Sequence, residues 1–335
     1  MLSYRHGFHA GNAADVLKHS VLIFCLEYLT QKEKPLLCVD THAGAGLYPL
    51  REGFAAQNRE WENGVGKLMN AAHKGELCAM LRRYLELCVP AQHGGILPKE
   101  PDTYPGSPLI MARVLAARLL QASGRLPQAS GHLPQAGGRL PRPADRLVCF
   151  ELHPADYKAC KANLKNSAEL RQADGFAGLK ALLPPPSRRG LIFIDPPYEV
   201  KDDYTRLPET IADALKRFPS GTYIIWYPLL QEQPAGAGDL PARLMDLYQG
   251  NRCRAELYTS ALSPMAPEAV SGNSPRKMYG SGLVIYNPPW TLKAALEETL
   301  PVLGALIGTG NYVQFKDCNV MDATPPLSRG HNKHE

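Results

Sequence analysis

Residues 190–198 read GLIFIDPPY, a short apolar run that ends on Asp195, two prolines and a tyrosine. Continuous apolar character is typical of a strand that is covered on both faces. Proline cannot donate a hydrogen bond to a neighbouring strand, so the strand cannot continue past Asp195. The segment therefore predicts a buried strand followed by a stiff loop that carries Pro196 and Tyr198.

Four other apolar runs share this character: residues 34–40 (KPLLCVD), 146–151 (RLVCFE), 221–227 (GTYIIWY) and 282–287 (GLVIYN). Helical patterns lie between the runs, from Asn12 to about Leu29, from Ser107 to about Leu120, and from Asp156 to Leu170. Asn12 ahead of Asp15, and Ser107 ahead of Pro108, have the chemistry of helix N-termini. Strands that alternate with helices predict an α/β fold with a mainly parallel sheet, which binds ligands beyond the carboxyl ends of its strands.

The first run leads into a glycine turn, residues 40–46 (DTHAGAG). Small residues such as Gly44 let the backbone approach a ligand, although a turn without a ligand is the alternative. The second run ends at Glu151, where nucleotide-binding sheets place an acid that accepts ribose hydroxyls. Glu151 lies far beyond the usual ~20 residues from such a turn, which predicts inserted segments between the two.

Two stretches account for this gap. Residues 51–103 contain helical patterns and predict a small helical subdomain, while residues 121–141 read QASGRLP, QASGHLP and QAGGRLP. Gly and Pro in every copy forbid a continuous helix, so we predict a flexible surface insertion over residues 121–143. Because the stretch is basic, an arm that binds nucleic acid is the alternative.

The chemistry of the DPPY segment favours binding of an exocyclic amine on a planar base. Asp195 and the Pro196 carbonyl can accept the two amine hydrogens, while Tyr198 stacks on the ring. Asn287 and Trp290, in NPPW, could fill the same roles. We favour Asp195, because its run follows those of the glycine turn and Glu151 and so belongs near the middle of the sheet, whereas Asn287 belongs nearer an edge.

The composition excludes several classes of protein. The formal charge is +5, no run is apolar and long enough for a transmembrane helix, and the first ten residues lack the apolar core of a secretory signal. The eight cysteines form no C-x-x-C pair, which indicates a reduced compartment. We therefore expect a soluble cytoplasmic protein, with no metal, since no cysteine or carboxylate lies at finger-like spacing from the amino-terminal histidines.

Several polar residues have two interpretations each. Lys18 and His19 reach the bound cofactor or substrate, or else face solvent; His6 and His9 contact phosphate or belong to a solvated tail. Lys158, Lys161 and Lys165 share one helical stripe and, with Arg188 and Arg189, form either a solvated face or a phosphate track; these five residues stay open alternatives.

Taken together, these segments closely resemble the ribosomal RNA large-subunit methyltransferase J family. The resemblance is carried, in order along the chain, by YRHGFHAGNAADVLKH (residues 4–19), DTHAGAG, YPGSP, ELHP, ADGF, SRRGLIFIDPPYE and NPPW. It implies a Rossmann-like, S-adenosylmethionine-dependent methyltransferase that modifies N6 of one adenine of 23S rRNA, position 2030 in the usual bacterial numbering. The proline-rich repeat is a departure from the family pattern, but it lies away from every matched motif.

The resemblance also implies the site residues. By motif, the cofactor contacts are His19, His42, Ser107, Glu151, Asp174, Gly175 and Asp195, and the glycine turn adds Gly44. Asp195 is also the catalytic residue, with Pro196 and Tyr198 beside it, and Tyr4 acts on the RNA together with Lys18 and Tyr198.

We therefore expect a methyltransferase domain made of residues 1–50 and 104–320, with the helical insertion at 51–103 and a disordered tail at 321–335. The target adenine must be unstacked, which is easiest before the ribosome is fully assembled. The expected partner is 23S rRNA, with no membrane and no obligate protein partner, so the chain acts as a monomer. The alternatives are an N6-methyltransferase of DNA adenine and a non-enzymatic RNA-binding assembly factor.

Overall fold

The computed structural model describes residues 5–89, 97–122, 145–199, 202–231, 239–259 and 278–308. Tyr4, nearly all of the repeat and the 321–335 tail lie outside these residues. Within the described ranges, no helix combines the length and the apolar character needed to cross a membrane.

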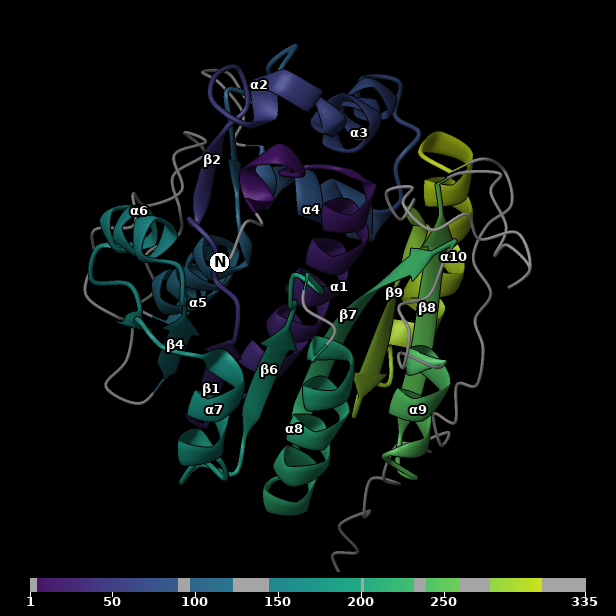
Figure 1. The fold of residues 1–335 in the computed structure, drawn as a ribbon. Coiled ribbons are helices and arrows are strands. Elements are labelled where there is room, and N and C mark those ends of the chain that lie inside the picture. Colours follow the sequence, from purple (N-terminus) through teal and green to yellow (C-terminus); the bar gives the residue numbers. More distant parts are fainter. Residues whose placement is uncertain are drawn as a thin grey trace, which may run out of the picture.

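A seven-stranded sheet forms the centre of the molecule (Figure 1). Its strands lie in the order β5 (Glu169–Arg171), β4 (Arg146–Phe150), β1 (Leu37–Asp40), β6 (Gly190–Ile194), β7 (Thr222–Leu230), β9 (Met278–Tyr286) and β8 (Arg252–Tyr258). The first five are parallel, and β9 is antiparallel to both of its neighbours. The predicted α/β fold with a mainly parallel sheet is confirmed.

Strand β1 is the switch point of this sheet, since it pairs with β4 on one side and with β6 on the other. Ligands bind in the crevice that such a switch opens beyond the carboxyl ends of the strands. Asp40, Glu151 and Asp195 end β1 or directly follow β4 and β6, so the fold brings these three carboxylates to one edge.

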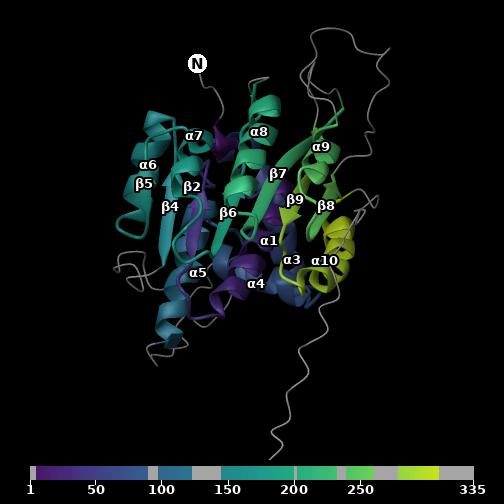
Figure 2. The same cartoon turned by 90° about the horizontal axis from the view of Figure 1, so that it is seen from below.

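Helices cover both faces of the sheet (Figure 2). One face packs against α1 (Ala13–Thr30), α5 (Ser107–Ala122) and α10 (Leu292–Leu306), and the other against α7 (Gly175–Leu179), α8 (Asp203–Arg217) and α9 (Leu240–Asp246). Strand β6 serves both cores by alternation: Leu191 and Phe193 face the first set, and Ile192 and Ile194 the second. This two-sided burial explains why the strand is apolar throughout.

The helix starts largely follow the sequence signals. The Asn12 side chain accepts a hydrogen bond from the Asp15 N–H at 3.0 Å, as its capping pattern predicts, and α5 begins at Ser107. The helix predicted to run to Leu170 is wrong at its end: α6 (Pro154–Leu164) stops before Lys165, which has a left-handed φ of 53°. The next residues extend into β5, because pairing with β4 outweighs the helical pattern.

An insertion follows β1 and lies beyond the carboxyl ends of the parallel strands (Figure 1). Its ends pair as antiparallel strands β2 (Leu47–Pro49) and β3 (Thr103–Pro105). Between them lie α2 (Ala55–Asn58), the 3-10 turn η2 (Glu60–Asn63), α3 (Val65–His73) and α4 (Ala79–Cys88). Buried residues of these helices share one core with α1 and α10, so the insertion packs on the sheet domain; its standing as a separate domain remains a prediction.

Candidate active site

A cavity opens at the carboxyl edge of the sheet, and every strand from β5 to β6 contributes to it. Its lining includes Thr41–Gly44 after β1, Glu151–His153 after β4, Ala173–Phe176 after β5, Asp195 after β6, and Ser107 at the start of α5. His19 also lines it. The structure thus brings together every residue that the resemblance assigns to the cofactor, and we call this space the acidic cavity.

The glycine turn and Glu151 are directly linked. The Gly44 N–H donates to Glu151 Oε2 at 2.8 Å, and the His153 N–H donates to Oε1 at 2.7 Å. Gly44 has a φ of 59°, and a Cβ here would lie 2.2 Å from the Tyr48 hydroxyl oxygen, so only glycine fits the turn. Burial raises the pKa of Glu151, which the two N–H donors partly offset.

Asp174 and Gly175 form the third corner of the acidic cavity. Asp174 caps α7 by accepting the Phe176 N–H at 2.8 Å, and it also pairs with Arg206 of α8. Gly175 packs so closely on the glycine turn that a Cβ would lie 2.0 Å from the Thr41 carbonyl oxygen. The close approach of β1 and α7 therefore requires glycine at this position.

Two histidines of the acidic cavity, His19 and His42, are uncharged at neutral pH. Burial lowers the pKa of His19 to about 3 and that of His42 to about 4. His19 Nδ1 lies 2.8 Å from the Tyr104 hydroxyl, and His42 Nδ1 lies 2.8 Å from the Thr41 hydroxyl. The alternative in which His19 faces solvent is wrong, since its exposed fraction is 1%.

The charge of the acidic cavity limits what it can bind. Its charged lining consists of one guanidinium, Arg206, and the carboxylates of Glu151, Asp156, Asp174, Asp195, Glu199 and Asp203. This excess of negative charge opposes a phosphate-bearing dinucleotide and suits a cation that carries hydroxyl and amine groups. Neutral His19 and His42 leave that balance unchanged.

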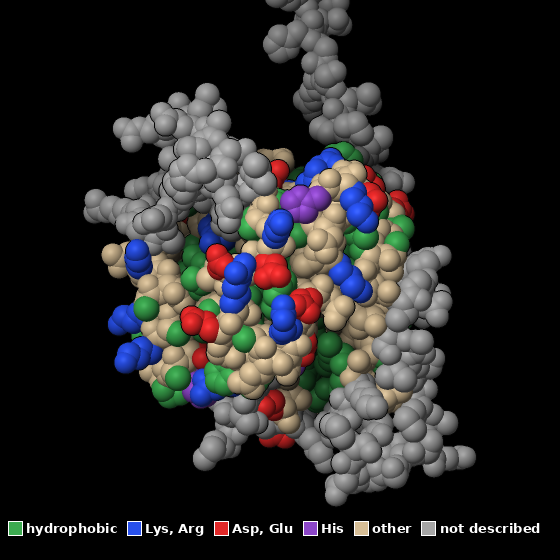
Figure 3. All heavy atoms as spheres, turned by 90° about the horizontal axis from the view of Figure 1, so that it is seen from above, with side chains coloured by type: hydrophobic (Ala, Val, Ile, Leu, Met, Phe, Trp, Pro, Cys, Tyr) green, Lys and Arg blue, Asp and Glu red, His purple; other side chains and the backbone are tan. Residues whose placement is uncertain are grey.

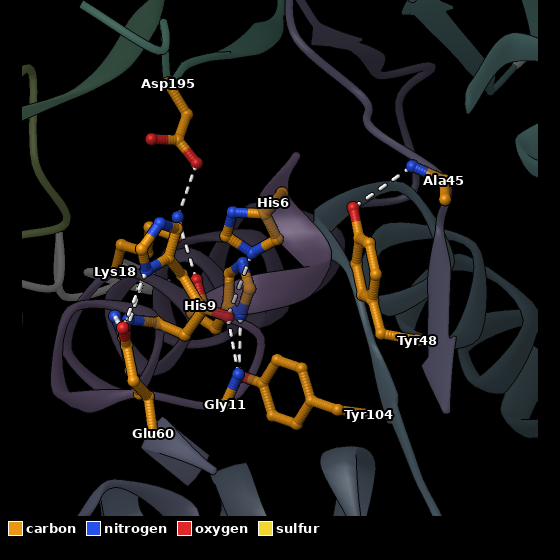
Figure 4. A network of polar contacts seen from close by, with 12 residues as sticks. His6, His9, Gly11, Lys18, Ala45, Tyr48, Glu60, Tyr104 and Asp195 are labelled. Atoms are coloured by element: carbon orange, nitrogen blue, oxygen red, sulfur yellow. Dashed lines mark hydrogen bonds and ion pairs between the residues drawn. The ribbon is translucent and has the colours of Figure 1, made fainter. Parts of the chain in front are cut away.

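Asp195 is held by a buried chain of charges that begins on α1 (Figure 4). Lys18 Nζ lies 2.6 Å from Asp195 Oδ2 and 2.8 Å from Asp15 Oδ1, and Asp15 Oδ2 accepts the Gly11 N–H at 2.8 Å. His6 Nε2 lies 3.1 Å from the same Asp15 oxygen. Burial alone would raise the pKa of Asp15, but its attraction to His6 and Lys18 holds that pKa well below its usual value. Lys18 is buried, so its solvent-facing alternative is also wrong.

A second cavity shares Pro197 with the first, and we call it the aromatic cavity. It is lined by Tyr198, Tyr204, Trp226, Lys18 and Pro197, and among other residues by His6 and His9. His6 and Pro197 line both cavities, so the two adjoin at these residues, and Asp195 of the acidic cavity contacts Lys18 of the aromatic cavity. Pro196 is buried and lines neither of these two cavities.

Tyr198 is fixed rather than projecting. It has a φ of 55°, its hydroxyl donates to the Trp226 carbonyl at 2.6 Å, and its ring centroid lies 5.0 Å from that of Tyr204 and 5.7 Å from that of Trp226. Sequence reasoning missed Tyr204 and Trp226. The signal for Trp226 was present, because it is a polar-tipped aromatic inside the apolar run of residues 221–227.

Several other candidates lie away from both cavities. Because β9 runs antiparallel to β7, Asn287 lies at the opposite edge of the sheet, where it donates to Pro219 and Gly221 carbonyls. Arg189 precedes β6, also at the opposite edge, and donates to the Leu29 and Lys34 carbonyls at 2.5 Å. Arg189 thus holds the end of α1 and the segment before β1, and the alternatives of a solvated face and a phosphate track stay open. Lys158, Lys161, Lys165 and Arg188 are exposed.

The structure shows whether His6 and His9 belong to a solvated tail. His9 Nδ1 lies 2.9 Å from Glu60 of the insertion, and His6 contacts Asp15 as described. Both therefore belong to an ordered segment, so the solvated-tail alternative is wrong for the described residues that follow Tyr4. Contact with phosphate stays a prediction.

Comparison with known proteins places this geometry in a family. A family model described as "Ribosomal RNA large subunit methyltransferase D, RlmJ" matches residues 33–123 and 116–314. Two similar proteins are called ribosomal RNA large subunit methyltransferase J: one from Haemophilus influenzae is 36% identical over 318 residues, and one from Escherichia coli is 38% identical over 317. Each alignment covers 93% of this chain and 97% of the relative.

A solved structure agrees with the sequence relatives. The crystal structure of a protein from Legionella pneumophila is 30% identical to this chain, covers 93% of it and 99% of its own length, and superposes with a TM-score of 0.71. The resemblance of the motifs is thus confirmed over nearly the whole chain. This chain belongs to the ribosomal RNA large subunit methyltransferase J family and is a methyltransferase.

Proposed function

We propose that this chain transfers a methyl group from S-adenosylmethionine to the N6 amine of one adenine in 23S rRNA, position 2030 in the usual bacterial numbering. One observation carries the proposal: Asp195 lines the acidic cavity, built on a nucleotide-binding strand edge, and contacts Lys18, which lines the adjoining aromatic cavity. A cationic methyl donor suits the first cavity, and a planar base suits the second.

The residues of the acidic cavity fit S-adenosylmethionine. The ribose hydroxyls and the adenine amine of this cofactor can donate hydrogen bonds to Glu151 and Asp174. The positive charges of its sulfonium and ammonium groups complement the surrounding carboxylates. His19, His42, Gly44, Ser107 and Gly175 would complete the contacts. When bound, this cofactor supplies an electrophilic methyl group.

The aromatic cavity would hold the target adenine, unstacked from its neighbours. Tyr198 and Trp226 offer ring faces, and Lys18 lies 5.3 Å from the Trp226 ring centroid. Lys18 donates a hydrogen bond to Asp195 Oδ2, and no described residue donates one to Asp195 Oδ1. Oδ1 would accept one N6 hydrogen, which shifts electron density toward nitrogen. The role of the Pro196 carbonyl as the second acceptor stays a prediction, because Pro196 lines neither cavity.

The proton balance follows from this arrangement. The N6–methyl bond forms as the sulfur–methyl bond breaks, and the nitrogen becomes positively charged. The Asp195 carboxylate then takes one N6 proton, which restores a neutral methylated amine. Alignment of amine and methyl would supply much of the rate, with the carboxylate tuning the amine.

The substrate and setting complete the proposal. Because the base must leave its stack, we infer that the chain acts on 23S rRNA before the ribosome is fully assembled. We also propose that it acts in the cytoplasm and as a monomer. Tyr4 precedes the described residues, and we propose that it contacts the RNA.

The test is transfer of labelled methyl from S-adenosylmethionine to deproteinised 23S rRNA, to assembled large subunits and to duplex DNA, followed by mapping of the product. We expect one N6-methyladenosine in the free rRNA and little product in the other two. Equal labelling of DNA would contradict the RNA assignment, and failure to bind the donor in calorimetry would contradict the cofactor.

A further inference from the structure

One aromatic side chain near the site remains unexplained by the reaction. Phe54, just before α2, is 45% exposed, whereas most aromatic rings of the described residues are buried. A single exposed apolar residue needs no special explanation. Phe54 differs because other groups fix its ring in place.

Three residues of the amino-terminal segment hold the Phe54 ring. The Phe8 ring centroid lies 4.7 Å away at an angle of 51°, and the Arg5 guanidinium lies 6.0 Å from the Phe54 centroid. Gly7 is close enough that a Cβ there would lie 3.2 Å from Phe54 Cβ. The ring is thus supported by protein yet remains nearly half open to solvent.

The same amino-terminal segment forms part of the site. Arg5 pairs with Asp156 of α6 at 3.2 Å, His6 lines both cavities, and His9 lines the aromatic cavity. The Phe54 ring is therefore joined through Phe8 to the residues around the aromatic cavity.

The Arg5 guanidinium is a cation beside the Phe54 ring, and two further arginines lie near Phe54 in the sequence. Arg51 and Arg59 each have side chains 55% exposed, and each pairs with surface carboxylates: Arg51 with Asp102 at 2.9 Å, and Arg59 with Glu62. Figure 3 shows Lys and Arg side chains spread over the face seen from above, between acidic ones.

We propose that Phe54 is a stacking platform for an unpaired RNA base next to the target adenine. The inference rests on the proposed RNA substrate and adds a subsite to it. Exposed aromatic faces beside cations are the surfaces on which proteins stack single-stranded bases. The ring supplies affinity for the RNA and makes no contact with the reacting atoms.

The test compares Phe54→Leu, which keeps an apolar contact with Phe8, with Phe54→Tyr, which keeps the aromatic face. Trp290→Leu is the matched control, because Trp290 is also an exposed aromatic but follows β9 at the opposite edge of the sheet. With a deproteinised rRNA fragment, Phe54→Leu should raise Kd and KM by about 5- to 100-fold, the effect of losing one base stack. The kcat of Phe54→Leu and its Kd for S-adenosylmethionine should match those of the wild type. Phe54→Tyr and Trp290→Leu should match the wild type in kcat, in KM and in both Kd values.

A second measurement separates stacking from mere support of the amino-terminal segment. Nucleotides flanking the target are replaced one at a time by abasic residues, and RNA affinity is measured for wild type and Phe54→Leu. At one position the abasic RNA should weaken wild-type binding and leave Phe54→Leu unaffected. The proposal would be overturned if Phe54→Leu bound the intact RNA as tightly as the wild type does. It would also be overturned if Phe54→Leu bound the intact RNA and every abasic RNA more weakly than the wild type by the same factor. Failure of the wild type to methylate an RNA that it binds would count against the proposed function alone.

Discussion

Lys18 Nζ lies 2.6 Å from Asp195 Oδ2, which ties the first helix to the loop after β6 across more than half of the sequence. With Asp15 at 2.8 Å on its other side, this ammonium is almost fully buried between two carboxylates. A buried charge of this kind is stable only when paired, so α1 and the DPPY loop hold each other in position.

Lys18→Met should therefore lower the free energy of unfolding by about 3–5 kcal/mol, since it leaves the buried Asp15 and the partly buried Asp195 without their shared cation. Urea titration measures the loss. Combining it with Asp15→Asn should cost less than the sum of the two single changes, because one of the stranded charges is gone. Strictly additive losses would mean that the three charges do not act as a unit.

Asp40 gives the protein a pH dependence of stability that one substitution can remove. Burial raises the pKa of Asp40 to about 7, against hydrogen bonds from Ser107 and His42 that lower it. Between about pH 4 and pH 7 the folded chain keeps a proton that the unfolded chain has released, so stability falls as the pH rises through this window. The slope from this group is at most about 1.4 kcal/mol per pH unit.

Asp40→Asn should abolish that contribution. The free energy of unfolding of the wild type, relative to the variant, should fall between pH 5 and pH 7 and level off above. Parallel pH curves for the two proteins would show that Asp40 is ionised in the folded state throughout.

His19→Ala should weaken binding of S-adenosylmethionine by about 1–3 kcal/mol, because it removes a buried polar group from the acidic cavity. Tyr104→Phe removes the hydroxyl that lies 2.8 Å from His19 Nδ1 and should weaken binding in the same direction by less. Calorimetry gives both values, with exposed His73→Ala as the control. Unchanged affinity in His19→Ala would remove this residue from the cofactor site.

The repeat should be dispensable for folding. Its two flanks are pinned to each other, since Arg118 of α5 pairs with Asp145 at 2.6 Å and Asp145 accepts the Leu36 N–H at 2.8 Å. Replacing residues 123–143 with a short Gly/Ser linker should shift Tm by no more than about 2 °C and leave catalysis unchanged. A large drop in Tm would contradict this, while lost RNA affinity alone would favour the basic-arm alternative.

The sequence predicted the elements whose signals are local. Apolar runs that end on acids marked β1, β4 and β6, and the Asn12 and Ser107 patterns marked the starts of α1 and α5. Such signals suffice because burial on both faces and N-terminal capping are properties of single segments.

What the sequence could not predict depended on partners far along the chain. Residues 169 and 170 have a helical pattern in the sequence, but they pair with β4 as part of β5. The direction of β9, which places Asn287 away from the cavities, follows from its place between β7 and β8. Strand direction, rather than the strand order used in the sequence argument, separates Asn287 from the cavities, while the role of Asp195 stays a prediction. Lys18 and Asp15 likewise gain their role only when α1 meets the loop after β6.

The most direct test of the account is the single-turnover rate of methyl transfer at saturating rRNA and S-adenosylmethionine. Asp195→Asn keeps the size of the side chain but loses the carboxylate, and its rate should fall at least ~10²-fold, as for other positioned catalytic groups. Asn287→Ala should lose stability, because Asn287 anchors the turn before β7, yet the folded fraction should react at the wild-type rate. A near-normal rate in folded Asp195→Asn, or a collapse of the rate in folded Asn287→Ala, would contradict the assignment of the reaction to Asp195.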